Sequence, residues 1–398
     1  MKTSIENKTL TIYLEGRIDT SNAAAVEKEM VSAVEGAPDA SLVLDAAGLE
    51  YISSAGLRIL MKLRKMKKEG LPMINVSSDV YDILDVTGFT ELLEVKKTLR
   101  EISVDGCELI GSGGYGKVYR IDKETIAKIY SPGVSLSFVE QERNTSQKAF
   151  LMGVPTAISY DVVKCGDCYG VVYELLNAKT TAQIIDENPA KIQEVFGKSA
   201  ALLKQLHQIV PGDDSGLPDR KDKLLSWVDS ISEYITEEEA AKIKGFIRSI
   251  PDRNTFLHGD YNAKNVMIQD GEFLLIDIGD AAIGHPVFDI AGLMLAFIIL
   301  PNSRGGGKSD EELKRLLGFD FQYAQSVWGV MCATYFGLRT PEEIGAVTQK
   351  LMPYCLLLMS FHAFGVNRGN EAMNKILVEK VVREKLLPSI DYAQPIDF

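Results

Sequence analysis

Residues 257–268 have the sequence LHGDYNAKNVMI, and residues 273–280 follow with FLLIDIGD. The apolar runs predict two short strands, so that Asp260, Asn265 and Asp277 fall on a loop, a strand start and a strand end. Phosphoryl transfer needs one carboxylate to orient the attacking hydroxyl, and a carboxylate with an amide to hold metal ions on the phosphates. Asp260 is therefore the candidate catalytic residue, and Asn265 and Asp277 are the candidate Mg²⁺ ligands.

A glycine-rich segment, LIGSGGYGKVY, lies upstream at residues 109–119. A dinucleotide-binding fold would need these glycines between a strand and a helix, but 118–121 and 125–129 predict two strands around a turn. A Walker loop would need Ser or Thr after Lys117, where Val118 stands. The remaining interpretation is a glycine-rich hairpin whose backbone amides approach a polyphosphate. Its candidate nucleotide-binding residues are Gly111, Ser112, Gly113, Gly114, Gly116 and Val118.

Lys128 follows this hairpin on the next predicted strand, with apolar residues on both sides. A lysine at this place can reach the α and β phosphates of ATP, so Lys128 is a candidate for both nucleotide binding and catalysis. Its carboxylate partner is expected on the predicted helix 137–150. Glu142 is the preferred partner and Glu140 the rival, and the sequence does not decide which one faces inward. The predicted cofactors are ATP and Mg²⁺.

These motifs resemble the kinase-like phosphotransferase superfamily over about residues 105–390. HGDYNAKNVMI and LIDIGD are more similar to its aminoglycoside phosphotransferase and choline kinase branch than to protein kinases. The resemblance implies a bilobal α+β protein-kinase-like fold at 101–398, with an N-lobe at about 101–176 and a C-lobe at about 177–398. It also implies that Glu174 and Leu176 lie in the hinge that binds adenine.

Two further features bear on the acceptor. Gly259 stands where protein kinases have the arginine that binds a phosphorylated activation loop, and the stretch after Asp280 is too short for an activation segment. It resembles instead the link into a helix whose aspartate, here Asp289, braces the catalytic loop. The glycine loop, however, is closer to the protein-kinase form than in many members of the branch, so a protein acceptor stays open beside a small molecule.

The first hundred residues predict a separate α/β unit, in which strands alternate with helices. Gly16 is expected to end the first long strand. Ser53 and Ser54 precede a helix expected from Leu57, where a serine either caps the helix or carries a phosphate that the helix dipole stabilises. The expected strands are 9–14, 42–44, 72–76 and 92–95, and the expected helices are 22–34, 57–68 and 80–86.

Three motifs in this unit, LEGRIDT, LVLDAAGLEYISSAGLRIL and VTGFTELLEV, resemble a STAS domain of the anti-sigma-factor antagonist type. The resemblance covers residues 1–97 and implies a domain at about 1–100 with a mixed sheet and helices. It implies that Ser54 is the phosphorylation candidate, although Ser53 occupies the position where the family usually has Asp. It also implies an anti-sigma-type or other STAS-binding protein partner.

The composition and charge of the chain narrow the classes of protein and partner that need to be considered. The chain has 398 residues and a net charge of −12, which argues against nucleic acid and anionic membrane as partners. The apolar stretch 290–300 is too short to span a bilayer, Met1-Lys2-Thr3 opens no signal peptide, and five cysteines form no disulfide framework. A cytoplasmic protein is expected. His207 is interpreted as a core histidine, and the glycine-rich stretch 302–308 as a linker.

The sequence therefore predicts an ATP- and Mg²⁺-dependent phosphotransferase that acts on a hydroxyl group of an unidentified small molecule and is regulated or localised by a STAS domain. The alternative is a signalling protein of the anti-sigma-factor antagonist type. Its kinase-like half would phosphorylate a protein serine, Ser54 among the candidates, or would only sense nucleotide.

Overall fold

The computed structural model describes residues 1–398 except 68–69, 213–214, 303–308, 368 and 397. The chain forms two compact units, Met1–Glu101 and Ile102–Phe398. Each unit has its own buried apolar core. The interpretation of 302–308 as a linker falls almost wholly on residues outside the described part.

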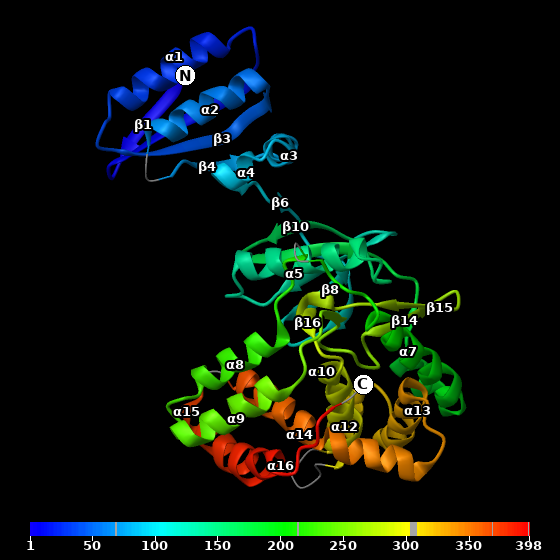
Figure 1. The fold of residues 1–398 in the computed structure, drawn as a ribbon. Helices are drawn as coiled ribbons and strands as arrows, with labels where there is room; N and C mark the ends of the chain where they lie inside the picture. Colours follow the sequence, from blue (N-terminus) through cyan, green and yellow to red (C-terminus); the bar gives the residue numbers. More distant parts are fainter. Residues whose placement is uncertain (68–69, 213–214, 303–308, 368, 397) are drawn as a thin grey trace. The chain divides into compact units, whose positions relative to one another are not determined.

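The first unit is a mixed sheet covered by helices, so the predicted fold class is confirmed for this part (Figure 1). Its strand order is β1-β2-β3-β4-β5, with β1 antiparallel to β2 and the other neighbours parallel. The strands are β1 (Lys2–Glu6), β2 (Thr9–Ile18), β3 (Ser41–Ile52), β4 (Pro72–Val76) and β5 (Glu94–Lys97), followed by β6 (Arg100–Glu101). The helices are α1 (Ala23–Glu35), α2 (Ser54–Met66), α3 (Ser78–Val86) and α4 (Phe89–Leu92).

Two of the predicted strands in this unit end too early, and the strand predicted at 92–95 lies at Glu94–Lys97 instead. Gly16 does not end β2; its φ of 65° lies at a shift of register, where the strand bulges and continues to Ile18. Strand β3 runs well beyond the predicted 42–44 because it stays paired with β2 along its length. The small residues Ala46, Ala47 and Gly48 interrupt the apolar pattern and hide this extension.

The second unit begins with an antiparallel sheet in which neighbouring strands follow the order β10-β11-β9-β8-β7. Helix α5 (Leu136–Leu151) packs against this sheet. Lys128 lies on β9, between neighbours on β8 and β11, so the predicted glycine-rich hairpin and its following lysine strand are both present. The strands are β7 (Glu108–Ser112), β8 (Gly116–Arg120), β9 (Thr125–Tyr130), β10 (Ser159–Cys165) and β11 (Cys168–Glu174).

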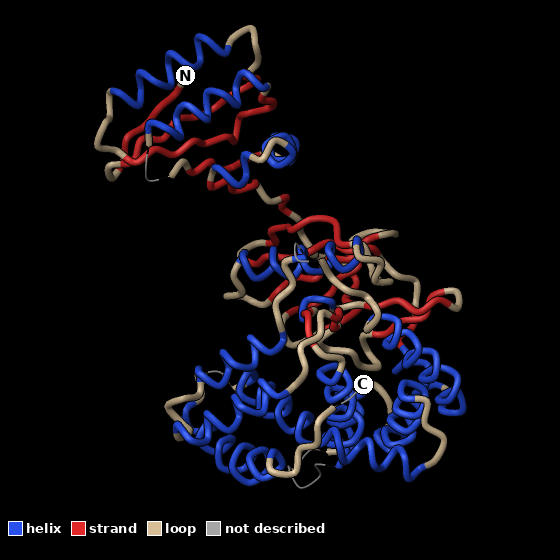
Figure 2. Tube along the Cα trace, viewed as in Figure 1, coloured by secondary structure: helices blue, strands red, loops and turns tan. Residues whose placement is uncertain are grey.

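The rest of this unit is mainly helical, with short strand pairs around the HGD motif (Figure 2). The short strands are β12 (Lys179–Thr180), β13 (Thr255–Leu257), β14 (Val266–Gln269), β15 (Glu272–Leu275) and β16 (Ala282–Gly284). The α-helices are α6 (Thr181–Glu187), α7 (Ile192–Leu206), α8 (Arg220–Ser230), α9 (Glu237–Ser249), α10 (Val287–Met294), α11 (Leu300–Asn302), α12 (Asp310–Leu317), α13 (Ala324–Phe336), α14 (Pro341–Val366), α15 (Glu371–Leu377) and α16 (Leu387–Ile390). Segments Pro189–Lys191, Ile278–Asp280 and Phe321–Tyr323 are 3₁₀ turns, and Leu295–Ile299 and Val378–Leu386 are π-helical.

Residues 221–249 and 311–359 have the apolar periodicity of long helices, but they fold as several shorter ones. Gly318 and Gly337 take left-handed conformations that end α12 and α13. Thr340 then starts α14 with a capping box and a proline in its first turn. Apolar periodicity predicted the buried faces, but it did not reveal these breaks.

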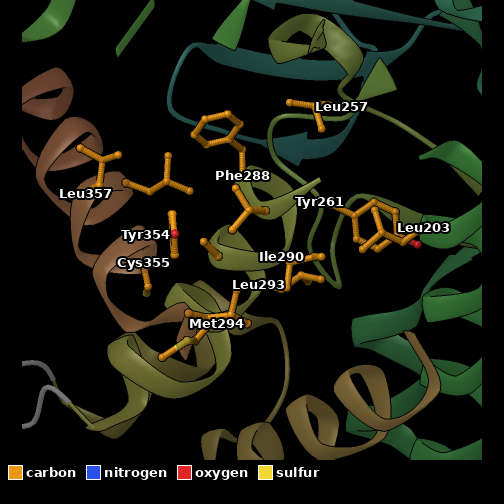
Figure 3. Packing of buried hydrophobic residues seen from close by; sticks show 14 of the residues in the cluster. Leu203, Leu257, Tyr261, Phe288, Ile290, Leu293, Met294, Tyr354, Cys355 and Leu357 are labelled. Atoms are coloured by element: carbon orange, nitrogen blue, oxygen red, sulfur yellow. The ribbon is translucent and has the colours of Figure 1, made fainter. Parts of the chain in front are cut away.

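Helix α14 is long and apolar enough to cross a membrane by length and composition. Its side chains Tyr354, Cys355 and Leu357 instead face the side chains of α10 in the core of the second unit (Figure 3). A core helix of a globular domain passes the same length test, so α14 is explained by its packing. The same core supports Leu257 at the end of β13, directly before the HGD motif.

Candidate active site

The loop that carries Asp260 is held by one buried carboxylate. Asp289 on α10 accepts hydrogen bonds from the backbone N–H groups of His258 and Gly259, both at 2.8 Å. His207 Nε2 lies 3.2 Å from Asp289 Oδ2, and Tyr335 OH lies 2.7 Å from His207 Nδ1. Burial opposes ionisation, but the hydrogen bond and charge of His207 hold the pKa of Asp289 below its ordinary value. The loop is therefore fixed by a charged acceptor.

Gly259 is required by the geometry of this loop. Its φ is 85°, and a Cβ at this position would lie 2.1 Å from the carbonyl oxygen of Asp280 and 2.4 Å from Arg220 Nη2. No side chain fits without moving backbone. The replacement of the protein-kinase arginine by glycine therefore has a local steric reason in this chain.

The carboxylate of Asp260 is oriented by two amides. Asn265 Nδ2 donates to Asp260 Oδ2 at 2.9 Å, and Asn262 Nδ2 donates to Oδ1 at 3.0 Å. Asp260 is exposed at one edge, but the surrounding protein displaces water from its carboxylate, and this burial raises the pKa of Asp260. The nearby carboxylates of Asp277 and Asp280 also raise this pKa. Such a carboxylate is held in place and is a stronger proton acceptor than an ordinary aspartate.

Lys128 bridges two acids that come from distant parts of the chain. Its Nζ lies 2.6 Å from Glu142 Oε1 on α5 and 2.7 Å from Asp277 Oδ1. Burial alone would lower the pKa of Lys128, but the two carboxylates raise it above its ordinary value, so the lysine stays charged. Of the two candidate partners, Glu142 is the one that pairs with Lys128.

Asp277 and Gly279 explain how this bridge is built. Asp277 has a φ of 61°, an uncommon conformation for a residue other than glycine. A Cβ on Gly279 would lie 2.5 Å from Glu142 Cγ, so the glycine lets Glu142 approach. Asn265 uses its amide nitrogen on Asp260, and among the described residues its Oδ1 accepts no hydrogen bond. The Asn265 oxygen and the half-exposed Asp277 carboxylate are thus hard oxygen donors suited to Mg²⁺.

The glycine-rich turn is closed by a hydrogen bond from Gly113 N–H to the Gly116 carbonyl at 2.9 Å. A Cβ on Gly116 would lie 2.2 Å from the carbonyl oxygen of Ile129, so this glycine is needed for strand packing. Gly113 and Gly114 have open space around them, which leaves their backbone accessible. Gly111 and Val118 are half-buried on facing strands, and Ser112 is exposed.

The predicted hinge begins at Glu174, the last residue of β11. Glu174 Oε2 accepts a hydrogen bond from Ile158 N–H at 3.3 Å, and Leu175 N–H donates to the Glu124 carbonyl at 2.7 Å. Within the described part of the chain, the N–H of Leu176 has no partner, so it is a free donor at the point where adenine binding is expected. The Glu174 side chain is engaged in a hydrogen bond within the protein. This favours adenine binding through the backbone of the segment.

Ser53 and Ser54 of the first unit have different surroundings. Ser53 Oγ accepts hydrogen bonds from Ala55 N–H at 3.2 Å and Gly56 N–H at 3.5 Å, so Ser53 is the N-cap of α2. Such a cap contributes about 1 kcal/mol. Helix α2 therefore begins at Ser54, three residues before the predicted start. Ser54 is exposed, and its hydroxyl has no partner among the described residues.

Sequence reasoning missed two supports of the site. His207 is buried, as expected of a core histidine, but it also holds Asp289 through a hydrogen bond. Arg220 is buried, and its Nη2 donates to the Asp280 carbonyl at 3.1 Å. His207 directly follows α7 and Arg220 is the first residue of α8, both far from the HGD motif in sequence, and no local spacing connects them with it.

Comparisons with known proteins agree with this architecture. The model of the phosphotransferase enzyme family matches residues 106–323, and the model of the STAS domain matches residues 1–102. Among curated proteins, "Putative anti-sigma factor antagonist BtrV" of Bordetella bronchiseptica is 31% identical over 90 residues, which cover 22% of this chain and 76% of that protein.

Solved structures with low sequence identity are similar to each part. The gentamicin complex of aminoglycoside phosphotransferase APH(2")-IIa is 16% identical with a TM-score of 0.45, covering 71% of this chain and 92% of that chain. A choline/ethanolamine kinase family protein from Mesorhizobium loti is 14% identical with a TM-score of 0.41, covering 72% and 92%. An anti-sigma factor antagonist structure from Thermotoga maritima, described as putative, is 15% identical with a TM-score of 0.23, covering 24% and 86%.

The family match covers more than half of the chain and contains Lys128, Asp260 and Asp277. The predicted fold class and the predicted enzyme class, a phosphotransferase acting on a hydroxyl group, are confirmed. The chain thus belongs to the phosphotransferase enzyme family and carries a STAS domain at its N-terminal end.

Proposed function

We propose that this protein is a cytoplasmic ATP- and Mg²⁺-dependent kinase that phosphorylates a hydroxyl group of a small molecule, with the STAS domain as a regulatory or docking element. The observation that carries the proposal is the Lys128 bridge to Glu142 and Asp277, together with the oriented carboxylate of Asp260. A protein that only sensed nucleotide would have no need of a proton acceptor held by two amides.

The proposed reaction is direct transfer of the γ-phosphoryl group. The acceptor hydroxyl oxygen bonds to the γ-phosphorus while the bond from that phosphorus to the β,γ-bridging oxygen breaks, and ADP leaves. Asp260 orients the hydroxyl and takes its proton. Lys128 binds the α and β phosphates, and the open Gly113–Gly114 backbone offers amides to the triphosphate.

Asn265 and Asp277 are proposed to hold Mg²⁺. When bound, the metal would neutralise charge on the phosphate oxygens. Within the described ranges, no group of three or more His, Cys, Asp and Glu side chains is placed to hold a metal. Two protein donors suit Mg²⁺, because this ion usually completes its octahedral shell with phosphate oxygens and water.

A small-molecule acceptor is favoured by the segment after Asp280. Only residues 281–286 separate Asp280 from α10, and β16 within them pairs with β13. This leaves no activation segment on which a peptide could dock. For the STAS domain, the 31% identity to BtrV supports a protein partner of the anti-sigma type.

Replacing Lys128 with alanine is expected to lower ATP turnover by about 10²–10³-fold, the usual effect of losing one electrostatic donor to the transition state. Turnover is measured as ADP release in the presence of Mg²⁺, with nucleotide affinity measured separately. Lys117→Ala, at an exposed lysine on the neighbouring strand, is the matched control and should keep wild-type turnover. A folded Lys128→Ala variant with an unchanged rate would contradict the assigned role.

A second candidate acceptor is Ser54, because its hydroxyl is exposed at the first turn of α2 and has no partner among the described residues. A phosphate there would be stabilised by the free amides and the helix dipole. The full-length protein is incubated with labelled ATP, and the phosphorylated residue is mapped by mass spectrometry, with Asp260→Asn and Ser54→Ala as controls. Label on Ser54 only when Asp260 is intact would show that the protein modifies itself. We expect no such label and consumption of ATP by a small hydroxyl acceptor instead.

A further inference from the structure

Three basic side chains lie near the catalytic loop, and none of them binds nucleotide or metal in the proposed reaction. Arg220 and Lys223 lie on α8, and His362 lies on α14. We refer to these three residues as the basic cluster. Its presence is notable because the chain as a whole has a net charge of −12.

Helix geometry brings the cluster together. Arg220, Lys223 and Trp227 are spaced by three and four residues, so they share one face of α8. The ring of Trp227 lies 6.1 Å from Phe361 and 5.9 Å from Phe364, so this face packs on α14. His362 is the neighbour of Phe361, and its ring lies 5.3 Å from that of Phe361.

The cluster adjoins the place where an acceptor must bind. Arg220 Nη2 donates to the Asp280 carbonyl and lies where a side chain on Gly259, the residue before Asp260, would begin. The charge of Asp280 acts on Asp260, on Lys223 and on His362 alike. An acceptor whose hydroxyl reaches Asp260 can therefore place another group against the cluster.

The buried member of the cluster is Arg220. Arg220 is only 3% exposed, yet among the described residues it forms no ion pair, and its Nε has no hydrogen-bond partner. Lys223 has no ion pair in that part of the chain either. Burial and the nearby Arg220 charge lower the pKa of Lys223 and of His362, and the Asp280 carboxylate opposes this shift without reversing it. A buried cation without an ion pair is costly, so Arg220 gives this site a demand for an anion.

We propose that the basic cluster binds an anionic group of the acceptor, so that the substrate is an alcohol carrying a phosphate or a carboxylate. This inference rests on the proposed kinase function and specifies its substrate class. Arg220 and Lys223 supply charge-assisted hydrogen bonds, and His362 supplies a neutral donor. The Asp280 carboxylate lies near the cluster. It would repel the anionic group and so keep that group away from Asp260.

The test compares alcohols that differ in charge. Glycerol 3-phosphate, glycerate, glycerol and choline are offered to the full-length protein with Mg²⁺-ATP, and phosphorylated products are quantified by mass spectrometry. We expect the anionic alcohols to have a kcat/KM at least about tenfold above those of glycerol and choline, the factor expected for one charge-assisted hydrogen bond. The phosphate and carboxylate arms show which anion is preferred.

Charge reversal identifies the residues responsible. Lys223→Glu is expected to raise the KM for the preferred anionic alcohol about tenfold or more and to reduce its advantage over choline. Arg248→Glu, at an exposed arginine on α9, is the matched control and should leave the preference unchanged. Melting temperatures of both variants show whether the fold is kept.

The outcomes separate the two proposals. A protein that binds no nucleotide and hydrolyses no ATP would overturn the kinase function itself. A protein that turns over ATP through Asp260 but prefers glycerol or choline, accepts neither anionic alcohol, or keeps its preference in Lys223→Glu would overturn only the anionic-acceptor inference.

Discussion

Replacing Asp260 with asparagine is expected to lower phosphoryl transfer by about 10²–10⁴-fold, the usual contribution of a general base. Asparagine has the same shape, but it cannot accept the hydroxyl proton. It would also place an amide NH₂ opposite the Nδ2 donor of Asn262 or Asn265, which now hydrogen-bond to the two carboxylate oxygens. The loop itself should persist, because Asp289 holds the backbone of His258 and Gly259.

The measurement for Asp260→Asn is ADP release, combined with calorimetric binding of a non-hydrolysable ATP analogue. Nucleotide affinity should change little, so that the loss appears in kcat. Because burial raises the pKa of Asp260, the wild-type rate should fall on acidification at a pH above the ordinary aspartate range, as the carboxylate gains a proton. The variant should lack this acidic limb. A folded variant with the wild-type rate and pH profile would refute the role of Asp260.

The site residues that could be proposed from the sequence are those that lie close to one another along the chain. Asp260 and Asn265 lie five positions apart on one strand-flanking loop, and Asp277 follows at the end of the next hairpin. A single supersecondary unit brings these residues near one another, so their spacing in the sequence is enough to predict that they lie together. The same holds for the glycine-rich hairpin and Lys128.

The choice between Glu140 and Glu142 depends on a longer-range relation, namely which face of α5 packs toward β9 and the turn after β15. Gly279 is a signal for this packing in the sequence. Gly279 has no side chain because the Glu142 side chain occupies the adjoining space. A glycine two positions after the metal-ligand candidate indicates that a side chain from elsewhere packs there.

The supports of the site could not be predicted from spacing at all. Asp289 lies on α10, Tyr335 lies on α13 and His207 directly follows α7. These side chains meet only when the three helices pack together. The basic cluster likewise joins α8 to α14. Apolar periodicity identifies the buried face of each helix, but it does not say which polar side chains two buried faces bring into contact.

Replacing Asp277 with alanine is expected to abolish Mg²⁺-dependent turnover, with a loss of about 10³-fold or more, because the contribution of a metal ion to charge stabilisation is several kcal/mol. The Asp277 carboxylate is half-exposed and forms an ion pair with Lys128, so its removal leaves no cavity in the core. Lys128 keeps its ion pair with Glu142. Alanine is less suited than aspartate to a φ of 61°, which should cost about 1 kcal/mol and leave the fold intact.

Asp277→Asn separates the charge of this residue from its backbone conformation. Asparagine tolerates the left-handed conformation as well as aspartate does, so this variant should keep wild-type stability and still lose the Mg²⁺ response. Nucleotide affinity is titrated against Mg²⁺ for the wild type and both variants, and melting temperatures are recorded in parallel. The wild-type affinity should rise with Mg²⁺, while both variants should show a flat response. Either variant, folded and with normal Mg²⁺-stimulated turnover, would remove Asp277 from the metal site and leave its strained backbone and its contact with Lys128 in need of another explanation.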